Sequence, residues 1–461
     1  MLPQRLDAAV ARLKQITHDI VTETGDTTIL RRVREYGRAI RDAHPTWPAI
    51  RIGNLRATVP IVQGGMGVGI SLSGLASAVA DAGGIGVIAA NGIGLLERDY
   101  YKDGKAANLR AFRREIRAAR TRTQGVIGVN IMVAVNDFAD LLDVAIEEQV
   151  DIVFMGAGLP IKNLPVPRMR DAGVKAVPIV SSVRATEMIF KMWEKIYNDV
   201  PDAVVFEGPQ AGGHLGFTAE QIDDPEYQLE AITPAIVEAL RPFEKRFQRE
   251  IPLIAGGGVF TGEDIHTVLE LGAKGVQMGT RFVATEECDA DERFKEAYVD
   301  ANDSDIGLIQ SPVGMPGRAI RNTFIADSEA GIRPAFKCAW QCLSSCKADK
   351  AKYCISIALN NARQGNLKQG FVFAGSSAAR ITGITTVPEL IGELSAGFRA
   401  AAARSATDTL EALLGRIQRI REMIASLVPE AGLTRRTYEN YLKKKITESW
   451  TLVAGFGVPL P

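Results

Sequence analysis

The chain has 461 residues, with 54 basic and 54 acidic side chains, 46% hydrophobic residues, 44 glycines and five cysteines. This length allows one large domain or two to three ordinary ones, and it excludes a mini-protein held together by disulfides. A formal charge of zero provides no general attraction to nucleic acid or to anionic lipid, so we expect neither a nucleic-acid nor a membrane partner.

The first residues predict the compartment and a helical beginning. They are charged throughout, unlike a secretory signal, and no stretch of about 18 uncharged apolar residues occurs in the chain. Five cysteines are also few for a secreted protein, so we expect a cytoplasmic protein.

The N-terminal residues have a helical pattern. Ala8, Val10, Leu13 and Ile16 follow helical spacing, and HPTWP interrupts the pattern at His44–Pro48. Residues 1–50 are therefore predicted to form a helical segment.

Eight short, almost continuously apolar runs follow, and most are succeeded by a helical stretch. They are TVPIVQ from Thr58, IGVIAAN from Ile85, GVIGVNIM from Gly125, DIVFMG from Asp151, KAVPIVSS from Lys175, DAVVFEG from Asp202, IPLIAGGG from Ile251 and KGVQMGT from Lys274. Runs of this character are typical of strands in a buried parallel sheet. Eight such units predict an α/β fold, a TIM (β/α)8 barrel over residues 51–328, with an open doubly wound sheet as the alternative.

The ends of the last two runs carry the clearest ligand signal. Gly256, Gly257 and Gly258 end the seventh run, and Gly279 and Thr280 end the eighth. In a barrel these loops lie on the catalytic face, and backbone amides in a glycine-rich loop bind phosphate. We therefore predict a phosphate site here, although tight turns alone would also use glycine.

Three earlier strand ends add further candidates. QGGMGVG leaves the first strand through Gly64, Gly65 and Met66, where a flat ligand can lie against the backbone. Asn130 ends the third strand with an amide that donates and accepts hydrogen bonds. The sixth run continues into EGPQAGGHLG, which contains His214, the only histidine in a glycine-rich strand-end loop. A histidine at this rim is a candidate acid or base, whereas a lone histidine elsewhere is more often structural.

The region from residue 329 to 461 is predicted to be helical and to contain a cysteine cluster. Cys338, Cys342, Cys346 and Cys354 have the spacing C-x3-C-x3-C-x7-C. An unbroken helix would separate the first and third thiols by about 12 Å, so a break near residues 343–345 or a non-helical start is needed to bring the four together. Four converging cysteines suit a [4Fe–4S] cluster or zinc, and buried or redox-active thiols are the alternative.

Several of these segments together resemble a known family. QGGMG, EGPQAGGHLG, LIAGGGVFTGEDIHTVLELGAKGVQMGTRF and FVFAGSSAARITGITTVPELIGEL are similar, in this order, to the nitronate monooxygenases, formerly called 2-nitropropane dioxygenases. Flavin-type enoyl-acyl-carrier-protein reductases and some quinone reductases share this scaffold. The resemblance implies a barrel that binds FMN without a covalent bond.

The resemblance also implies roles for individual residues. The residues that would lie against the flavin ring are Gly64, Gly65, Met66 and Asn130, and those that would pass close to it are Gly212 and Gly213. The phosphate would be held by Gly256, Gly257, Gly258, Gly279 and Thr280. The expected cofactor-binding set is completed by Ser181, Glu207 and Gln277. His214 matches the family's catalytic histidine. Gln210 stands where the family commonly has an acidic residue, and Ser181 and Ser182 stand where some members have lysine.

The expected function is therefore that of an FMN-dependent oxidoreductase of nitronate monooxygenase type, acting on a small molecule with His214 as base or acid. An iron–sulfur cluster would add single-electron exchange with an electron-transfer protein. One alternative is an NAD(P)H-dependent reductase of an enoyl thioester or quinone. Another is a non-flavin barrel enzyme that binds a phosphate ligand, such as an IMP dehydrogenase-like protein. An IMP dehydrogenase-like protein would need a nucleophilic cysteine near the middle of the barrel, but no cysteine precedes Cys288.

Overall fold

The computed structural model describes Gln15 and residues 47–332, 336–344 and 346–431. Most of the helical segment predicted for residues 1–50, and the end of the chain from residue 432, lie outside the described residues. The chain divides into two compact units, one comprising residues 47–395 and the other residues 1–46 with 396–461. The first unit contains the barrel.

Eight parallel strands form a closed barrel, as the sequence predicts. They are β3 (Ile61–Gln63), β4 (Ile85–Ala89), β5 (Val126–Met132), β6 (Ile152–Gly156), β7 (Lys175–Val180), β8 (Val204–Glu207), β10 (Leu253–Gly256) and β11 (Gly275–Met278). Each strand pairs with its sequence neighbour within this set, β11 pairs with β3, and β8 pairs with β10. An open doubly wound sheet is therefore excluded, because the ladder has no free edge.

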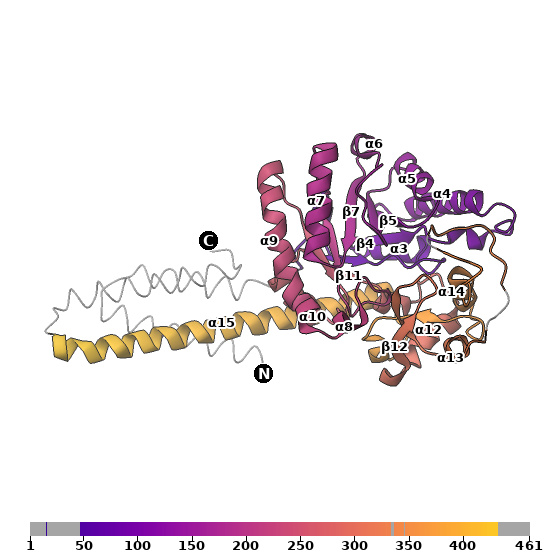
Figure 1. The fold of residues 1–461 in the computed structure, drawn as a ribbon. Coiled ribbons are helices and arrows are strands. Elements are labelled where there is room, and N and C mark those ends of the chain that lie inside the picture. The colour runs from indigo at the N-terminus through magenta and orange to yellow at the C-terminus, as the bar shows by residue number, and fades with distance from the viewer. Residues whose placement is uncertain (1–14, 16–46, 333–335, 345, 432–461) are drawn as a thin grey trace. The chain divides into compact units, whose positions relative to one another are not determined.

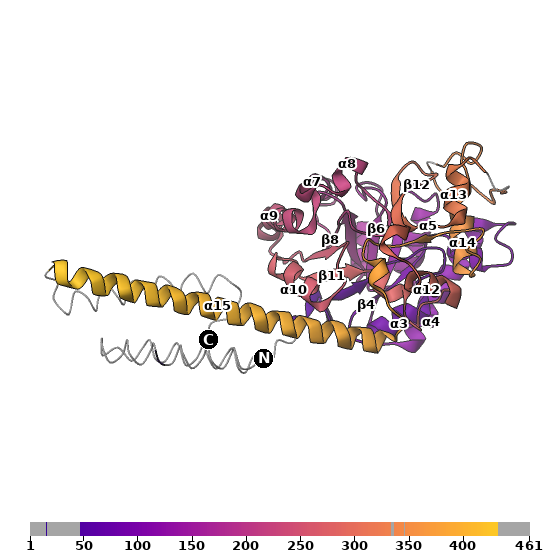
Figure 2. The same cartoon turned by 90° about the horizontal axis from the view of Figure 1, so that it is seen from below.

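Helices surround the barrel strands, as Figure 1 and Figure 2 show. They are α3 (Ser73–Asp81), α4 (Gly104–Arg122), α5 (Phe138–Glu147), α6 (Val166–Asp171), α7 (Val183–Tyr197), α9 (Leu229–Phe247), α10 (Gly262–Glu270) and α11 (Thr280–Val283). Helix α3 packs on α4, α4 on α5, and α7 on α9. The apolar sides of these helices cover the outer surface of the strands, which are therefore buried on both faces.

Helix α7 illustrates why the local sequence forms these elements. The hydroxyl of Ser182 accepts a hydrogen bond from the Ala185 N–H at 3.2 Å and begins the helix. Asn198 ends it in the left-handed conformation, with φ of 50°. Between them Trp193 is fully buried and donates its indole N–H to the Pro160 carbonyl at 2.6 Å.

A short hairpin that was not predicted closes the amino-terminal end of the barrel. Strands β1 (Ile50–Ile52) and β2 (Leu55–Ala57) pair antiparallel. Their buried side chains Ile50, Ile52 and Ala57 belong to the same core cluster as the inward-facing residues of the barrel strands. This packing leaves the opposite, carboxyl-terminal end of the barrel for a site.

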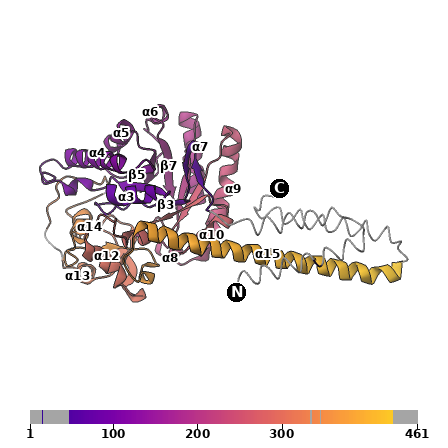
Figure 3. The same cartoon turned by 180° about the vertical axis from the view of Figure 1, so that it is seen from behind.

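A second, antiparallel sheet was also absent from the prediction. It contains β9 (Gly213–His214), β12 (Ile306–Gln310), β13 (Pro316–Ile320) and β14 (Val372–Phe373), with β13 paired to the other three. Around it lie α12 (Glu292–Val299), α13 (Thr323–Glu329) and α14 (Ile355–Arg363), which gather at one end of the barrel in Figure 1 and Figure 3. Because β9 comes directly after barrel strand β8, this sheet is attached to the rim where the site was predicted.

The remaining elements are short, except for the last helix. The short ones are α8 (Ala219–Ile222), η1 (Ile93–Leu96), η2 (Pro225–Tyr227), η3 (Asp303–Asp305) and η4 (Ala378–Arg380). Helix α15 (Val387–Ala431) lies in the region from residue 329 that was predicted to be helical. None of the helices within the described residues is both long and apolar enough to cross a membrane.

Candidate active site

A cavity of about 650 Å³ opens at the carboxyl-terminal end of the barrel. All of the predicted cofactor-binding residues except Gly256 line it, together with the predicted catalytic histidine. The lining members of that set are Gly64, Gly65, Met66, Asn130, Ser181, Glu207, Gly212, Gly213, His214, Gly257, Gly258, Gln277, Gly279 and Thr280. The structure thus brings together residues that lie more than 200 positions apart in the sequence.

Gly256 lies in strand β10 beneath the cavity rather than on its wall. Its carbonyl accepts a hydrogen bond from the Gly208 N–H at 2.8 Å. A Cβ added at this position would approach the carbonyl oxygen of Gln277 to 2.9 Å. In this structure the glycine therefore allows close packing of neighbouring strands.

The loop after β10 has a backbone conformation that favours glycine. Gly257 and Gly258 have φ values of +97° and +90°. A Cβ at Gly257 would lie 2.7 Å from the carbonyl oxygen of Gly208, and one at Gly258 would lie 3.1 Å from the Cβ of Gln210. The two glycines therefore expose bare backbone to the cavity, as a phosphate-binding loop requires.

The loop after β3 packs closely against the end of β5. The Gly64 N–H donates to the Met278 carbonyl at 2.9 Å, which joins the ends of β3 and β11. A Cβ at Gly65 would come within 2.3 Å of the Cβ of Asn130. Gly65 is therefore required for the Asn130 amide to reach the cavity wall.

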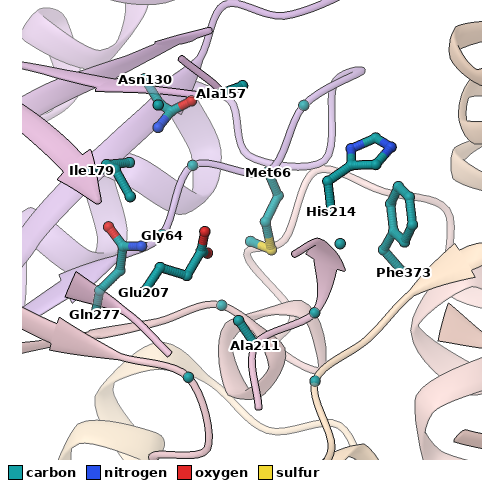
Figure 4. A pocket seen from close by; sticks show the side chains of 18 of the residues that line it. Gly64, Met66, Asn130, Ala157, Ile179, Glu207, Ala211, His214, Gln277 and Phe373 are labelled. Atoms are coloured by element: carbon teal, nitrogen blue, oxygen red, sulfur yellow. The ribbon is translucent and has the colours of Figure 1, made fainter. Parts of the chain in front are cut away.

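Three polar side chains of the cavity wall have no hydrogen-bond partner among the described residues. Asn130, Glu207 and Gln277 end strands β5, β8 and β11 or lie near their ends, and Figure 4 shows them on the same side of the cavity. None of them makes a side-chain hydrogen bond to another residue in the described part of the chain. Burial raises the pKa of Glu207 from 4.5 to about 7. Polar groups left without partners on a concave wall fit a ligand that supplies hydrogen bonds of its own.

His214 lies on the other side of the cavity, across Met66 from these residues (Figure 4). Its Nε2 is 2.7 Å from the hydroxyl oxygen of Ser311, and its ring makes an edge contact with Phe373 at 5.1 Å between centroids. Burial lowers the pKa of His214 to about 4, so the imidazole is neutral at pH 7. A neutral, oriented imidazole is able to accept a proton.

The backbone around His214 is held by residues that sequence reasoning missed. Strand β9 pairs with β13, which places His214 opposite Gly317. The buried guanidinium of Arg318 donates to the carbonyls of Pro209 and Ala211 at 2.5 and 2.8 Å. These bonds fix the loop between β8 and β9. Nothing in the sequence around Arg318 distinguishes it from a surface arginine.

Residues 373–377 form another missed part of the cavity wall, although the family resemblance includes this segment. A Cβ at Gly212 would come within 2.5 Å of the Ala374 backbone, so the two chains touch directly. The Gly375 N–H donates to the Thr280 hydroxyl at 3.0 Å, and the Ser376 N–H donates to the Gln210 carbonyl at 3.1 Å. The segment therefore covers the predicted phosphate loop.

The predicted departures from the family pattern have ordinary local roles. Ser181 lines the cavity, and its hydroxyl donates to the Gly216 carbonyl at 3.0 Å. Gln210 also lines the cavity, and its side-chain amide lies 3.4 Å from the Gln228 amide oxygen. Neither side chain brings a charge to the cavity wall.

The four clustered cysteines line a second cavity, of about 310 Å³. All four are free thiols, and the described residues between 336 and 354 contain no helix, which agrees with the predicted break. No group of three or more histidine, cysteine, aspartate or glutamate side chains in the described part of the chain is arranged to hold a single metal ion. The cysteines converge, but not in the geometry of a single-ion site.

The closed barrel and the cavity at its carboxyl-terminal end define the architecture of a (β/α)8 enzyme. The family model for nitronate monooxygenase matches residues 51–397, so the chain belongs to the nitronate monooxygenase family. A probable nitronate monooxygenase of Staphylococcus saprophyticus is 28% identical over 302 aligned positions, and the match covers 59% of this chain and 78% of that protein.

Two further proteins show the range of this family's relatives. A (3aS,4S,5R,7aS)-5-hydroxy-7a-methyl-1-oxo-octahydro-1H-indene-4-carboxyl-CoA dehydrogenase of Mycobacterium tuberculosis is 28% identical over 278 residues, 59% of this chain and 66% of that protein. The solved structure of nitroalkane oxidase from Streptomyces ansochromogenes is 25% identical, covers 76% of this chain and 98% of that one, and has a TM-score of 0.58. The family and these relatives identify the chain as an oxidoreductase.

Proposed function

We propose that the protein is an FMN-dependent oxidoreductase that acts on nitronates or nitroalkanes. The observation that carries the proposal is the arrangement of Asn130, Glu207 and Gln277, whose side chains have no hydrogen-bond partner among the described residues and share one cavity with the glycine loops. FMN combines a phosphate with a flat ring whose edge donates and accepts hydrogen bonds. The cavity offers bare backbone for the phosphate and polar side chains for the edge of the ring.

The chain's own residues would divide this binding between them. Gly257, Gly258, Gly279 and Thr280 would hold the phosphate, because they form the bare-backbone loop after β10 and the start of α11. Gly64–Met66 would lie against the ring, with Asn130, Glu207 and Gln277 bonding to its polar edge. When bound, FMN supplies the two-electron oxidation and reduction chemistry that no amino-acid side chain provides.

His214 would act as the general base. In the tautomer in which Nε2–H donates to Ser311, Nδ1 keeps its lone pair and is able to take the proton beside the nitro group. The lowered pKa keeps the ring neutral through the physiological range. Because Ser311 fixes the ring orientation, the base would need no reorganisation when substrate enters.

The decisive variant is His214→Ala, with His266→Ala as its control. His266 is another histidine, on α10, and it does not line the cavity. We expect His214→Ala to bind FMN but to lose 10²- to 10⁴-fold in kcat with a nitroalkane, on the order of other removed acid–base groups. His266→Ala should retain both FMN and turnover. Unchanged turnover in His214→Ala would remove this residue from the mechanism, and a colourless protein that FMN cannot reconstitute would overturn the cofactor proposal.

A second candidate is an NAD(P)H-dependent reductase of an enoyl thioester or a quinone on the same scaffold, with His214 as proton donor. The Mycobacterium tuberculosis relative, whose name describes a dehydrogenase of a carboxyl-CoA, supports a CoA thioester as the substrate of this candidate. Anaerobic mixing distinguishes the two, with the flavin spectrum as readout. Rapid bleaching by NADH or NADPH supports the reductase, whereas bleaching by a nitronate alone supports the monooxygenase type.

We also propose a cytoplasmic location. Three of the four clustered thiols are half-buried and the fourth, Cys338, is exposed, and none forms a disulfide. Thiols so placed persist in a reducing compartment.

A further inference from the structure

The cysteine segment is fastened to the rim of the barrel. Leu343 forms an antiparallel bridge with Val135, in the loop between β5 and α5. The Asn136 N–H donates to the Cys342 carbonyl at 3.0 Å, and the Ser344 N–H donates to the Ala134 carbonyl at 3.1 Å. Further along the chain, Cys354 occupies the position immediately before helix α14. The segment is therefore attached at two places, at the barrel rim through Leu343 and at the start of α14 through Cys354. These attachments hold the four cysteines in one region.

All four thiols face one cavity, and its size exceeds that of a single metal ion. The cavity measures about 310 Å³, so it has room for a group larger than one ion. Tetrahedral zinc with bonds of about 2.3 Å needs its thiolates about 3.8 Å apart, and the described residues show no such group. A cubane of four irons and four sulfides holds its four cysteines farther apart, around a larger core. We propose that Cys338, Cys342, Cys346 and Cys354 bind a [4Fe–4S] cluster.

The surroundings of the cysteines suit an anionic cluster. Cys354 is the N-cap residue of α14, where backbone N–H groups of the first turn have no partner within the helix. N–H groups that bond to sulfur are one of the means by which a protein stabilises a cluster and tunes its potential. Lysines are frequent along the same segment and have exposed side chains. They are Lys337, Lys347, Lys350 and Lys352, against one exposed acidic residue, Asp349.

The cluster site adjoins the main cavity. Leu343, Ile355 and Ser356 line both cavities, so a single layer of side chains separates them. Reduction of a flavin takes two electrons and two protons, and a cluster here would pass the two electrons singly, each drawn from a one-electron carrier protein, with the protons coming from solvent. The exposed lysines favour an acidic carrier. The cluster itself rests on the cysteines and stands whether or not the barrel binds FMN.

The test is metal analysis of the full chain, expressed and purified without oxygen. We expect about four irons and four acid-labile sulfides per chain and a broad visible absorption that dithionite bleaches. FMN content is measured on the same samples, so that loss of the cluster and loss of the flavin are separate results. One zinc per chain in place of iron, or no metal after anaerobic reconstitution with iron and sulfide, would overturn the proposal.

Single substitutions locate the site. Cys342→Ala and Cys354→Ala should each lower iron to less than about one per chain while FMN content stays near that of the unaltered protein. Cys288→Ala is the matched control, because Cys288 is buried elsewhere, with its sulfur 3.5 Å from the Ile70 carbonyl. It should keep all of its iron. Iron that persists at full content in both cluster variants would contradict the assignment, and if either variant fails to fold, the metal content of the unaltered chain decides.

Discussion

The main cavity has two walls that are built in different ways. The strand-end wall comes from the barrel itself and contains Asn130, Glu207 and Gln277, whose side chains have no partners in the described chain. The cover comes from the second sheet and the segments around it, and its polar groups are paired, as in the His214–Ser311 contact. Unpaired groups are available to a ligand, whereas paired groups are held in position. The strand-end wall is therefore suited to binding and the cover to orienting the reactive residue.

The largest expected effect comes from breaking the cover at Arg318. Arg318→Ala removes two hydrogen bonds from a buried guanidinium and leaves the carbonyls of Pro209 and Ala211 without a partner. We expect the free energy of unfolding to fall by about 3 kcal/mol. Turnover should fall as well, because β9 carries His214. Denaturant titration and steady-state kinetics measure the two effects.

Arg321→Ala is the matched control for that variant. Arg321 lies just beyond the same strand, but its ion pair with Glu329 is on the surface. Exposed pairs contribute less than about 1 kcal/mol, so this variant should remain close to the unaltered protein. Equal losses in both variants would show that Arg318 has no special role in the cover.

The strand-end wall is tested at Gly65. In Gly65→Ala the added Cβ would come within 2.3 Å of the Cβ of Asn130, which would have to move toward the ligand space. Overpacking of this kind costs about 1–3 kcal/mol, so we expect FMN to bind roughly 10- to 100-fold more weakly. Gly392→Ala is the control, since a Cβ there meets no atom within 4 Å. Flavin fluorescence titration gives both affinities, and equal Kd values would contradict the tight contact.

The two walls also differ in how far sequence could predict them. The strand-end wall follows from local rules, because each apolar run ends in glycine or a polar residue and a closed parallel ladder brings all those ends to one face. The sequence places Gly256 in the predicted phosphate loop together with Gly257, because the two are adjacent in the GGG run. The strand ends one residue later than expected, so only the second and third glycines reach the cavity.

The cover could not be predicted in this way, because its contacts join distant segments. Strand β9 has two residues, too few to show any periodicity, and its partner β13 lies about 100 positions further along the chain. Phe373 belongs to a segment that the family resemblance included, but nothing in its local sequence indicates contact with His214. The cysteine spacing predicted convergence and a break in the helix, while the cavity that the thiols share depends on Val135 and the barrel rim.

A smaller effect on the cover is expected at Ser311. Ser311→Ala removes the partner of the His214 ring, together with the acceptor of a longer hydrogen bond from the Val313 N–H at 3.4 Å. The loss of one hydrogen bond is worth about 1 kcal/mol, so kcat should fall roughly fivefold while FMN affinity stays constant. Ser328→Ala is the control, since the Ser328 hydroxyl is buried and has no hydrogen-bond partner in the described chain. Because Ser311 acts through His214, adding Ser311→Ala to His214→Ala should produce no further loss.

The smallest expected effect concerns Glu207 and the pH dependence of stability of the FMN-free protein. Its folded pKa of about 7 exceeds the ordinary value of 4.5, so the folded state holds this proton between these values while the unfolded chain has released it. Stability should therefore fall as pH rises from 4.5 to 7 and then level off. Allowing for partial exposure to the cavity, we expect a loss on the order of 1 kcal/mol. Glu207→Gln should lack this component, and unfolding titrations at pH 5 and pH 8 on both proteins measure it. If the two proteins lose the same stability between pH 5 and pH 8, the Glu207 carboxyl is not protonated by burial in the folded state. The strand-end wall would then not differ from the cover in this respect.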